Sequence, residues 1–484
     1  MRKASALVLL LTLAATMSLA EGADMNESRL HRDFRVEKES LSACTKLNFG
    51  SLIDCAQTVV MGQPMHITVG SLAPQNGIAA GLAFVEHKNF ADEWRTSFDI
   101  DGQAAGNGSW RAGAYMKAYR LPSGLVYRVA PLFNFYSQSI SLNRVDYFGL
   151  GPNTTPVAHS TFGFRENITG VNAAVPFGGA LKAAKLALVA ELNARFPSVR
   201  PGVDASVPSI GQLFDEATAP GLSHQAAYMQ ASEGVRIDPA LFTDRVRLNY
   251  LLQFQQFVAP GNGAYSFRRW NGDFGHEIPL HSILPKKLGS AYYPNRAALY
   301  QYNGPDDCTA SNGERNISRK RAAAAKPDPA RPCPIVSTTE KLEGSISLRA
   351  FLSESFADRG SFVPFYLSPT IGGSDVNGTA MLASYPDYRF RGSDLLLFRG
   401  TIEHSLGKLP IGALFSIDEA KIGLRRNDIS LDHLRHTFSA GLTVHAGGLP
   451  VVYFLFAWGG QEGNHSTATI SPTLLGSSAR PSLF

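Results

Sequence analysis

The sequence has little cysteine, little net charge and, beyond its N-terminus, no long apolar run. Four cysteines in 484 residues exclude a small domain held together by disulfides. A formal net charge of +5 is mild for this length, and no basic motif carries interleaved aromatic residues, so nucleic acid is not an expected partner. The longest late apolar run, Leu449–Trp458, is well below the ~18 residues that a membrane-spanning helix needs. Any later membrane span must therefore consist of strands.

Catalytic and metal-binding motifs are also missing. His276 and His281 resemble a metalloprotease pair, but that motif needs histidines at i and i+4 on a helix, and a proline stands between these two. Ser374 is not a nucleophile elbow, because the glycine required two residues after it is absent. His433 and His436 are expected to be a solvated pair. We therefore expect no enzyme, no metal site and no cofactor.

The N-terminus has the pattern of an export signal. Two basic residues precede a short apolar run, and the small residues Ser18 and Ala20 follow in the positions that a signal peptidase reads. The alternative is a membrane anchor, but the run is short for a spanning helix. The sequence thus predicts a cleaved signal peptide over residues 1–20 and a periplasmic stretch over residues 21–62.

The segment Arg245–Phe257 alternates between two kinds of side chain. In a strand, successive side chains point to opposite faces. The apolar face carries Val246, Leu248, Tyr250, Leu252 and Phe254. The polar face carries Arg245, Arg247, Asn249, Gln253 and Gln255. The apolar face fits lipid and the polar face a wet lumen, although the same pattern also occurs in a soluble β-sandwich.

The alternation recurs along the chain, for example in Lys185–Phe196 and Ser345–Ser353, with turn signals between the segments. Many such segments with arginine on the polar face, together with an export signal, favour a transmembrane antiparallel β-barrel over a secreted β-sandwich or solenoid. We expect an all-β barrel over residues 63–484 in the bacterial outer membrane. Its length fits a medium-sized barrel with some long loops.

The clearest long loop runs over about residues 284–340 and is rich in lysine and arginine. We expect a solvated outer loop, with contact to anionic lipid as the alternative. The cysteines fit an oxidising compartment. The simplest of three pairings is local, Cys44–Cys55 and Cys308–Cys333, and the alternative is four free thiols.

A family resemblance is carried by residues 363–406. Pro369, Gly372 and Gly373 match a proline followed by a glycine pair, and Glu403 matches an acidic residue that ends the next strand. Other matching positions are Tyr388, Arg389, Phe390 and Arg391 as a "YRFR" element, Phe415 and Asp418 in a later strand, the segment from Asp146, and the terminal Phe484. The region resembles the BamA/TamA-like bacterial surface antigen family of sixteen-stranded outer-membrane barrels.

The chain also departs from the family pattern. The Arg-Gly-aromatic loop motif falls on Leu382, Ala383, Ser384 and Tyr385, so its arginine and glycine are replaced. Only about forty residues separate the signal from the first expected strand, so no POTRA domain is expected. Both departures weaken the expectation of barrel-assembly activity.

The resemblance implies a loop that folds back into the barrel and pairs an arginine with acidic wall residues. Here we expect Arg389 or Arg391 to face Glu403 or Asp418, with both arginines simply lining a wet strand as the alternative. The implied function is that of an outer-membrane assembly or translocation factor, with unfolded barrel proteins, secreted proteins and periplasmic accessory proteins as candidate partners beside lipid. The alternative is a passive channel or structural barrel, and an outer-membrane barrel enzyme such as a lipase is the third option.

Overall fold

The computed structural model describes Phe34 and residues 64–90, 94–120, 131–177, 186–204, 206–238, 240–241, 246–281, 342–373, 381–406, 411–446 and 449–470. The predicted signal peptide, all four cysteines, the basic loop over about 284–340 and the terminal Phe484 lie outside the described residues. The two predicted disulfides therefore stay predictions.

Seventeen strands of the described chain form one antiparallel sheet. They are β1 (Met65–Ser71), β2 (Ile78–Phe90), β3 (Trp94–Ala105), β4 (Trp110–Arg120), β5 (Pro131–Tyr147), β6 (Ser160–Phe177), β7 (Leu186–Pro201), β8 (Tyr228–Ile237), β9 (Ala240–Leu241), β10 (Val246–Val258), β11 (Phe267–His281), β12 (Leu342–Phe356), β15 (Asp394–Ser405), β16 (Ile411–Gly423), β17 (Arg435–Ala446), β18 (Leu449–Gly460) and β19 (Gly463–Ile470). The two-residue β9 continues β8 along the same edge of β10, so the sheet has sixteen strand positions. The expected antiparallel all-β fold of about sixteen strands is confirmed.

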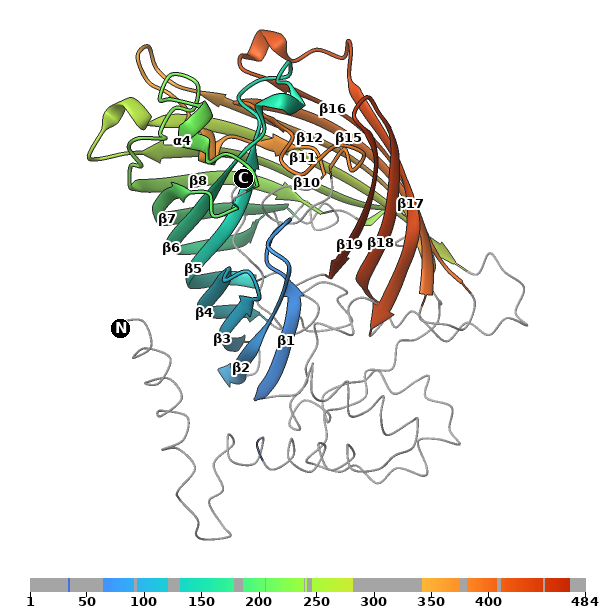
Figure 1. Cartoon of the computed structure of the whole chain (residues 1–484). Coiled ribbons are helices and arrows are strands. Elements are labelled where there is room, and N and C mark those ends of the chain that lie inside the picture. Colours follow the sequence, from blue (N-terminus) through green and yellow to red (C-terminus); the bar gives the residue numbers. More distant parts are fainter. Residues whose placement is uncertain are drawn as a thin grey trace, which may run out of the picture.

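The strands pair in the order in which they occur along the chain, so the sheet is a simple up-and-down meander. It curls strongly, and β1 and β19, its first and last strands, face each other across the opening in Figure 1. Within the described residues these two strands come close without forming a hydrogen-bonded ladder. The curled sheet is therefore open along this one seam.

The two faces of the sheet differ in the way that the alternation predicts. On β10, Leu252 is 47% exposed, whereas the next residue, Gln253, is buried on the opposite, inner face together with Gln255. Val246, Leu248, Tyr250 and Phe254 are half-buried, and Asn249, expected to face the lumen, is exposed. From Val246 to Gln255 the predicted segment is thus a strand with an apolar outer face and a mostly polar inner face.

The same arrangement, with apolar side chains on the outer face and polar side chains on the inner face, holds around the sheet. Exposed apolar side chains on its outer face include Leu82, Ile100, Phe135, Leu192, Trp270, Leu348, Ile402, Leu442 and Phe454. Ion pairs on its inner face are Arg111–Asp101, Arg195–Glu166, Arg349–Asp273 and Arg399–Asp418. A β-sandwich buries apolar side chains between its sheets. Here the inner wall is polar and the outer wall is apolar, so the sandwich alternative does not fit.

Antiparallel strands reverse direction at every turn, so alternate connections lie at the same end of the sheet. Several long connections lie at one of these two ends. This end, called the loop end below, carries the connections whose described residues are 148–159, 202–204 with 206–227, 259–266, 357–373 with 381–393, and 424–434. The largest hydrophobic cluster lies there, around Tyr147, Phe162, Tyr228 and Phe365. The apolar core therefore sits at the loop end rather than along the whole interior.

Helical structure is sparse in the part of the chain that the structure describes. α4 (Ile210–Leu213) is a single turn. No described helix has the length and the apolar character needed to cross a membrane. No cluster of three or more described His, Cys, Asp or Glu side chains could hold a metal ion. His276 and His281, considered above as a metalloprotease pair, lie in strand β11.

Candidate functional site

The connection between β12 and β15 folds back against the inner face of the sheet. Its described residues, 357–373 and 381–393, are called the inner loop. A short 3₁₀ turn, η8 (Phe365–Leu367), is completely buried. The Phe365 ring lies 5.1 Å from the ring of Tyr147 and 5.2 Å from that of Phe162. Aromatic packing of this kind holds the loop against β5 and β6.

Two glycines that match the family pattern shape the inner loop. Gly372 and Gly373 have φ angles of +108° and +60°, in the left-handed region where glycine is favoured. A Cβ on Gly372 would lie 2.5 Å from Cβ of Arg389, which leaves no room for a side chain. The amides of both glycines donate to the carbonyls of Met381 and Leu382, at 3.0 and 3.2 Å. The glycine pair thus brings the two arms of the loop together.

The residues aligned with the Arg-Gly-aromatic motif form the tip that touches the wall. Leu382, Ala383, Ser384 and Tyr385 are all buried. The amide of Leu382 donates to Asp418 of β16 at 2.9 Å, and the hydroxyl of Ser384 lies 2.6 Å from that of Thr437 on β17. A backbone amide and a serine hydroxyl therefore make the wall contacts at this tip.

Arg389 is the most heavily bonded side chain of the inner loop. Its guanidinium makes a bidentate pair with Glu462 at 2.6 and 2.7 Å, and it also donates to the hydroxyl and the carbonyl of Thr154. The same group lies over the rings of Phe148 and Phe390, at 4.9 and 4.5 Å from their centres. One buried side chain thus joins the inner loop, the connection between β5 and β6, and the turn between β18 and β19.

Arg391 is buried without a carboxylate partner among the described ion pairs. Its Nη1 donates to the carbonyl of Phe365 at 2.7 Å, and its guanidinium lies near the rings of Tyr147 and Phe365. The backbone carbonyl of Arg391 accepts from the amide of Gly151 at 2.7 Å. Burial lowers the pKa of Arg391 to about 10. Its contacts hold the loop together and fasten it to the connection after β5.

The two predicted wall carboxylates have other partners. Asp418 stands directly opposite Arg399 in the β15–β16 ladder and accepts two hydrogen bonds from it, at 2.7 and 2.8 Å. Glu403 accepts from Thr443 and lies 2.8 Å from Nε2 of His445.

The expected pairing of Arg389 or Arg391 with Glu403 or Asp418 therefore differs from the observed contacts. For Asp418 the reason is the strand register, which supplies an arginine from the adjacent strand. For Glu403 it is distance along the strand, since nine residues separate it from Asp394 at the loop end, about 30 Å of strand.

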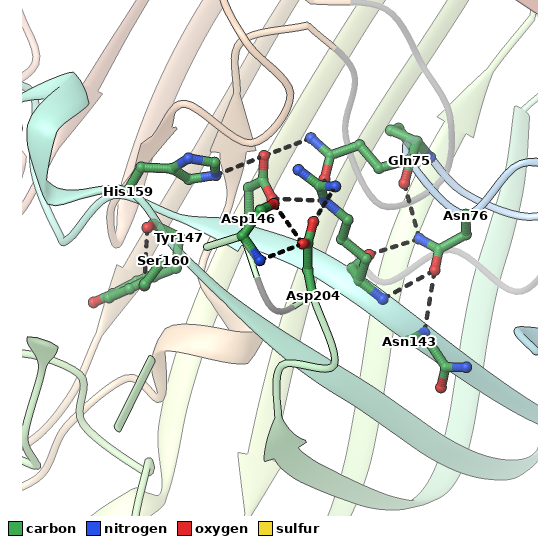
Figure 2. A network of polar contacts seen from close by, with 11 residues as sticks. Gln75, Asn76, Asn143, Asp146, Tyr147, His159, Ser160 and Asp204 are labelled. Carbon is green, nitrogen blue, oxygen red and sulfur yellow. Dashed lines mark hydrogen bonds and ion pairs between the residues drawn. The ribbon is translucent and has the colours of Figure 1, made fainter. Parts of the chain in front are cut away.

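A second polar cluster, shown in Figure 2, joins the turn after β1 to the loop end of β5. Asn76 is fully buried, donates to the carbonyls of Pro74 and Arg144, and accepts from the amides of Asn143 and Arg144. Asn76 also accepts from the hydroxyl of Ser109. A buried asparagine that satisfies so many backbone groups fixes this turn in one geometry.

Asp146 is the charged centre of the same cluster. It accepts from Gln75 at 2.6 Å, lies 3.4 Å from Arg144 and lies 3.1 Å from His159 (Figure 2). Arg144 in turn pairs with Asp204, in the connection after β7, at 2.6 Å. The cluster thereby anchors the seam strand β1 to two neighbouring loops. Gln75 and Asn76 follow no recognisable motif, so the sequence analysis did not find them.

Comparisons with known proteins give similarity at the level of structure only. No family model and no curated protein matches the chain. It is similar to CdiB from Acinetobacter baumannii, with 8% identity, a TM-score of 0.43, and coverage of 84% of this chain and 58% of that one. CdiB from Escherichia coli gives 13% identity, a TM-score of 0.45, and coverage of 84% and 62%.

A third similar structure is BamA from Haemophilus ducreyi lacking POTRA domains 1–3. It has 10% identity, a TM-score of 0.43, and coverage of 84% of this chain and 69% of that one. The chain thus spans less than two thirds of both CdiB structures.

Proposed function

We propose that the protein is an integral outer-membrane β-barrel of the BamA/TamA-like kind, with the sheet in lipid and the inner loop in its lumen. The observation that carries this proposal is that the outer face of the sheet is apolar and the inner face polar, the reverse of a soluble protein. Leucine, isoleucine and phenylalanine stand exposed on the outer wall, while arginine–carboxylate pairs and glutamines are buried on the inner wall. Lipid-facing apolar residues that alternate with lumen-facing polar residues are the pattern of membrane barrels.

Within that class we infer a role in handling other polypeptides, as an assembly or translocation factor. Two features support it beside the sequence resemblance. The strands β1 and β19 meet at a seam where the described residues form no ladder between them, and the edge of a sheet can accept a strand from another chain. The inner loop is fastened to the β18–β19 turn, next to that edge, through Arg389 and Glu462. The proposed substrates are unfolded barrel proteins or secreted proteins, with periplasmic accessory proteins as further partners.

A depletion experiment tests the role. We expect that loss of the protein lowers the amount of folded outer-membrane proteins or of secreted proteins, and that a plasmid copy restores it. A disulfide engineered across the seam between β1 and β19 should abolish rescue under oxidising conditions, and reductant should restore it. Normal levels of both protein classes after depletion would rule out the role and leave the passive or structural barrel.

A further inference from the structure

A cavity of about 450 Å³ opens at the loop end, between the top of β16, the start of β17 and the inner loop. Small-molecule sites usually have volumes of about 300–1,000 Å³. Four of the residues that line the cavity are basic, namely Lys421, His433, Arg435 and His436, and none is aspartate or glutamate. We name it the rim cavity.

The strand register creates the rim cavity. The ladder between β16 and β17 ends at the pair Ala420–Arg435, whereas β16 continues to Gly423 and pairs only with β15 there. The last residues of β16 therefore have a free edge on the β17 side. The connection over residues 424–434 arches over this notch, and Tyr385 and Phe390 of the inner loop close its inner side.

The two permanent cations of the rim cavity are held in place by neutral groups. The Lys421 ammonium donates to the hydroxyl of Ser430 at 2.7 Å and to the carbonyl of Asp432 at 2.8 Å. An ammonium has three N–H donors, so one remains for a ligand. Arg435 donates through Nη2 to the carbonyl of Pro152 at 2.6 Å. Neither cation forms an ion pair with a carboxylate among the described residues.

The position of Arg435 is fixed by aromatic packing. Its guanidinium lies 4.1 Å from the centre of the Phe390 ring and 5.9 Å from that of Tyr385. Stacking orients a guanidinium while leaving N–H groups at its edge available. The nearest carboxylate on the β18–β19 turn, Glu462, is already paired with Arg389. The rim cavity thus carries oriented positive charge with no acidic residue in its lining, and Glu419 stands outside the lining, opposite His436 in the ladder.

We propose that the rim cavity binds the phosphate group of a small molecule or of a lipid head group. Arg435, which Phe390 orients, is the direct ligand of the phosphate, and Lys421, His433 and His436 add positive charge and donors at the wall of the cavity. Arginine and lysine are the side chains that most often bind phosphate, and charge-assisted hydrogen bonds are the strongest in proteins. The volume exceeds that of the anion, so the cavity also accommodates the group that carries it.

The test uses the full-length protein in detergent and glucose 1-phosphate as the phosphate ester, with glucose as the uncharged control. We expect saturable binding of the ester by isothermal titration calorimetry and none of glucose. Arg435→Gln and Lys421→Gln should each weaken binding at least about tenfold, because each removes a positive charge and the charge-assisted hydrogen bonds that it donates. Arg426→Gln is the matched control, because Arg426 is exposed on the same connection and outside the cavity.

Reconstitution into nanodiscs then separates the two sources of phosphate. If a lipid head group is the ligand, phosphatidylglycerol but not phosphatidylcholine competes with the ester. If the ligand is soluble, neither lipid competes. Equal binding of glucose and its phosphate, equal loss in Arg426→Gln and Arg435→Gln, or binding that both cavity variants retain would overturn the proposal. Heat-modifiable electrophoretic mobility verifies that each variant is folded. If Arg435→Gln does not fold, the binding measured with Lys421→Gln tests the proposal.

Discussion

Arg389 and Glu462 form a bidentate ion pair, 73 residues apart in the sequence, that fastens the inner loop to the turn between β18 and β19. The arginine side chain is 1% exposed and the glutamate side chain 17% exposed. Removing one member of a buried pair leaves the other charge without compensation, which costs more than the loss of an exposed pair.

Arg389→Ala should accordingly destabilise the protein by about 3 kcal/mol. Urea-induced unfolding in lipid vesicles measures this change. Arg268→Ala is the matched control, because its contact with Asp358 is 4.0 Å long and both side chains are exposed; its expected cost is below ~1 kcal/mol. A double-mutant cycle with Glu462→Gln should show coupling, and additive effects would contradict the assignment.

The outer face of β10 gives a second prediction. Leu252→Arg places a charge on the apolar outer wall, where it should cost roughly 2–4 kcal/mol at mid-membrane. Asn249→Arg, on the predicted lumenal face of the same strand, should cost little. The same unfolding assay compares the two variants. Equal effects would mean that the outer wall does not face lipid.

The strand pattern of the fold could be predicted from the sequence, whereas most contacts of the site could not, for physical reasons. The alternation of Leu252 and Gln253 is local, because a strand exposes its two faces every second residue. Gly372 was recognised through the family pattern, and the structure supplies the physical reason for a glycine there, a backbone with positive φ. The partners of Asp418 and Arg389 could not be predicted from the sequence. The partner of Asp418 depends on the strand register. The partners of Arg389, Thr154 and Glu462, depend on the path of the inner loop.

The glycine pair of the inner loop gives a third prediction. Gly372→Ala meets both an unfavourable φ of +108° and a contact with Arg389 that is too short. Gly360→Ala is the matched control, with a φ of +86° and open space around the added methyl group. The control should cost roughly 1–2 kcal/mol from its backbone alone. Gly372→Ala should cost clearly more, and it should increase cleavage of the inner loop by added protease; equal costs would show that the close packing is unimportant.

The connection between β7 and β8 should depend on pH through Glu216. Burial alone raises the pKa of its carboxyl, but hydrogen bonds from Ser223, the Gly221 amide and Tyr265 outweigh burial and lower the pKa. Because the folded pKa lies below the unfolded one, the stabilisation is fully present above the ordinary glutamate value of 4.5 and is lost as the pH falls through the folded value. Limited proteolysis of this connection should therefore accelerate at acidic pH.

The variant Glu216→Gln provides the comparison for that pH dependence. It should be cleaved faster than the wild type at neutral pH and respond less to acidification, because the ionised carboxylate is gone. An unchanged acid response in this variant would assign the pH dependence to another group.

Single-channel recording in planar bilayers tests the central claim, that the sheet spans the membrane around a lumen occupied by the inner loop. We expect little steady conductance from the wild type and frequent large openings from Arg389→Ala, because the loop loses its attachment to the β18–β19 turn and to Thr154. Heat-modifiable electrophoretic mobility of the protein recovered with the lipid verifies that both proteins have inserted and folded. A large, constant wild-type conductance that Arg389→Ala leaves unchanged, or no conductance from either inserted protein, would contradict the claim.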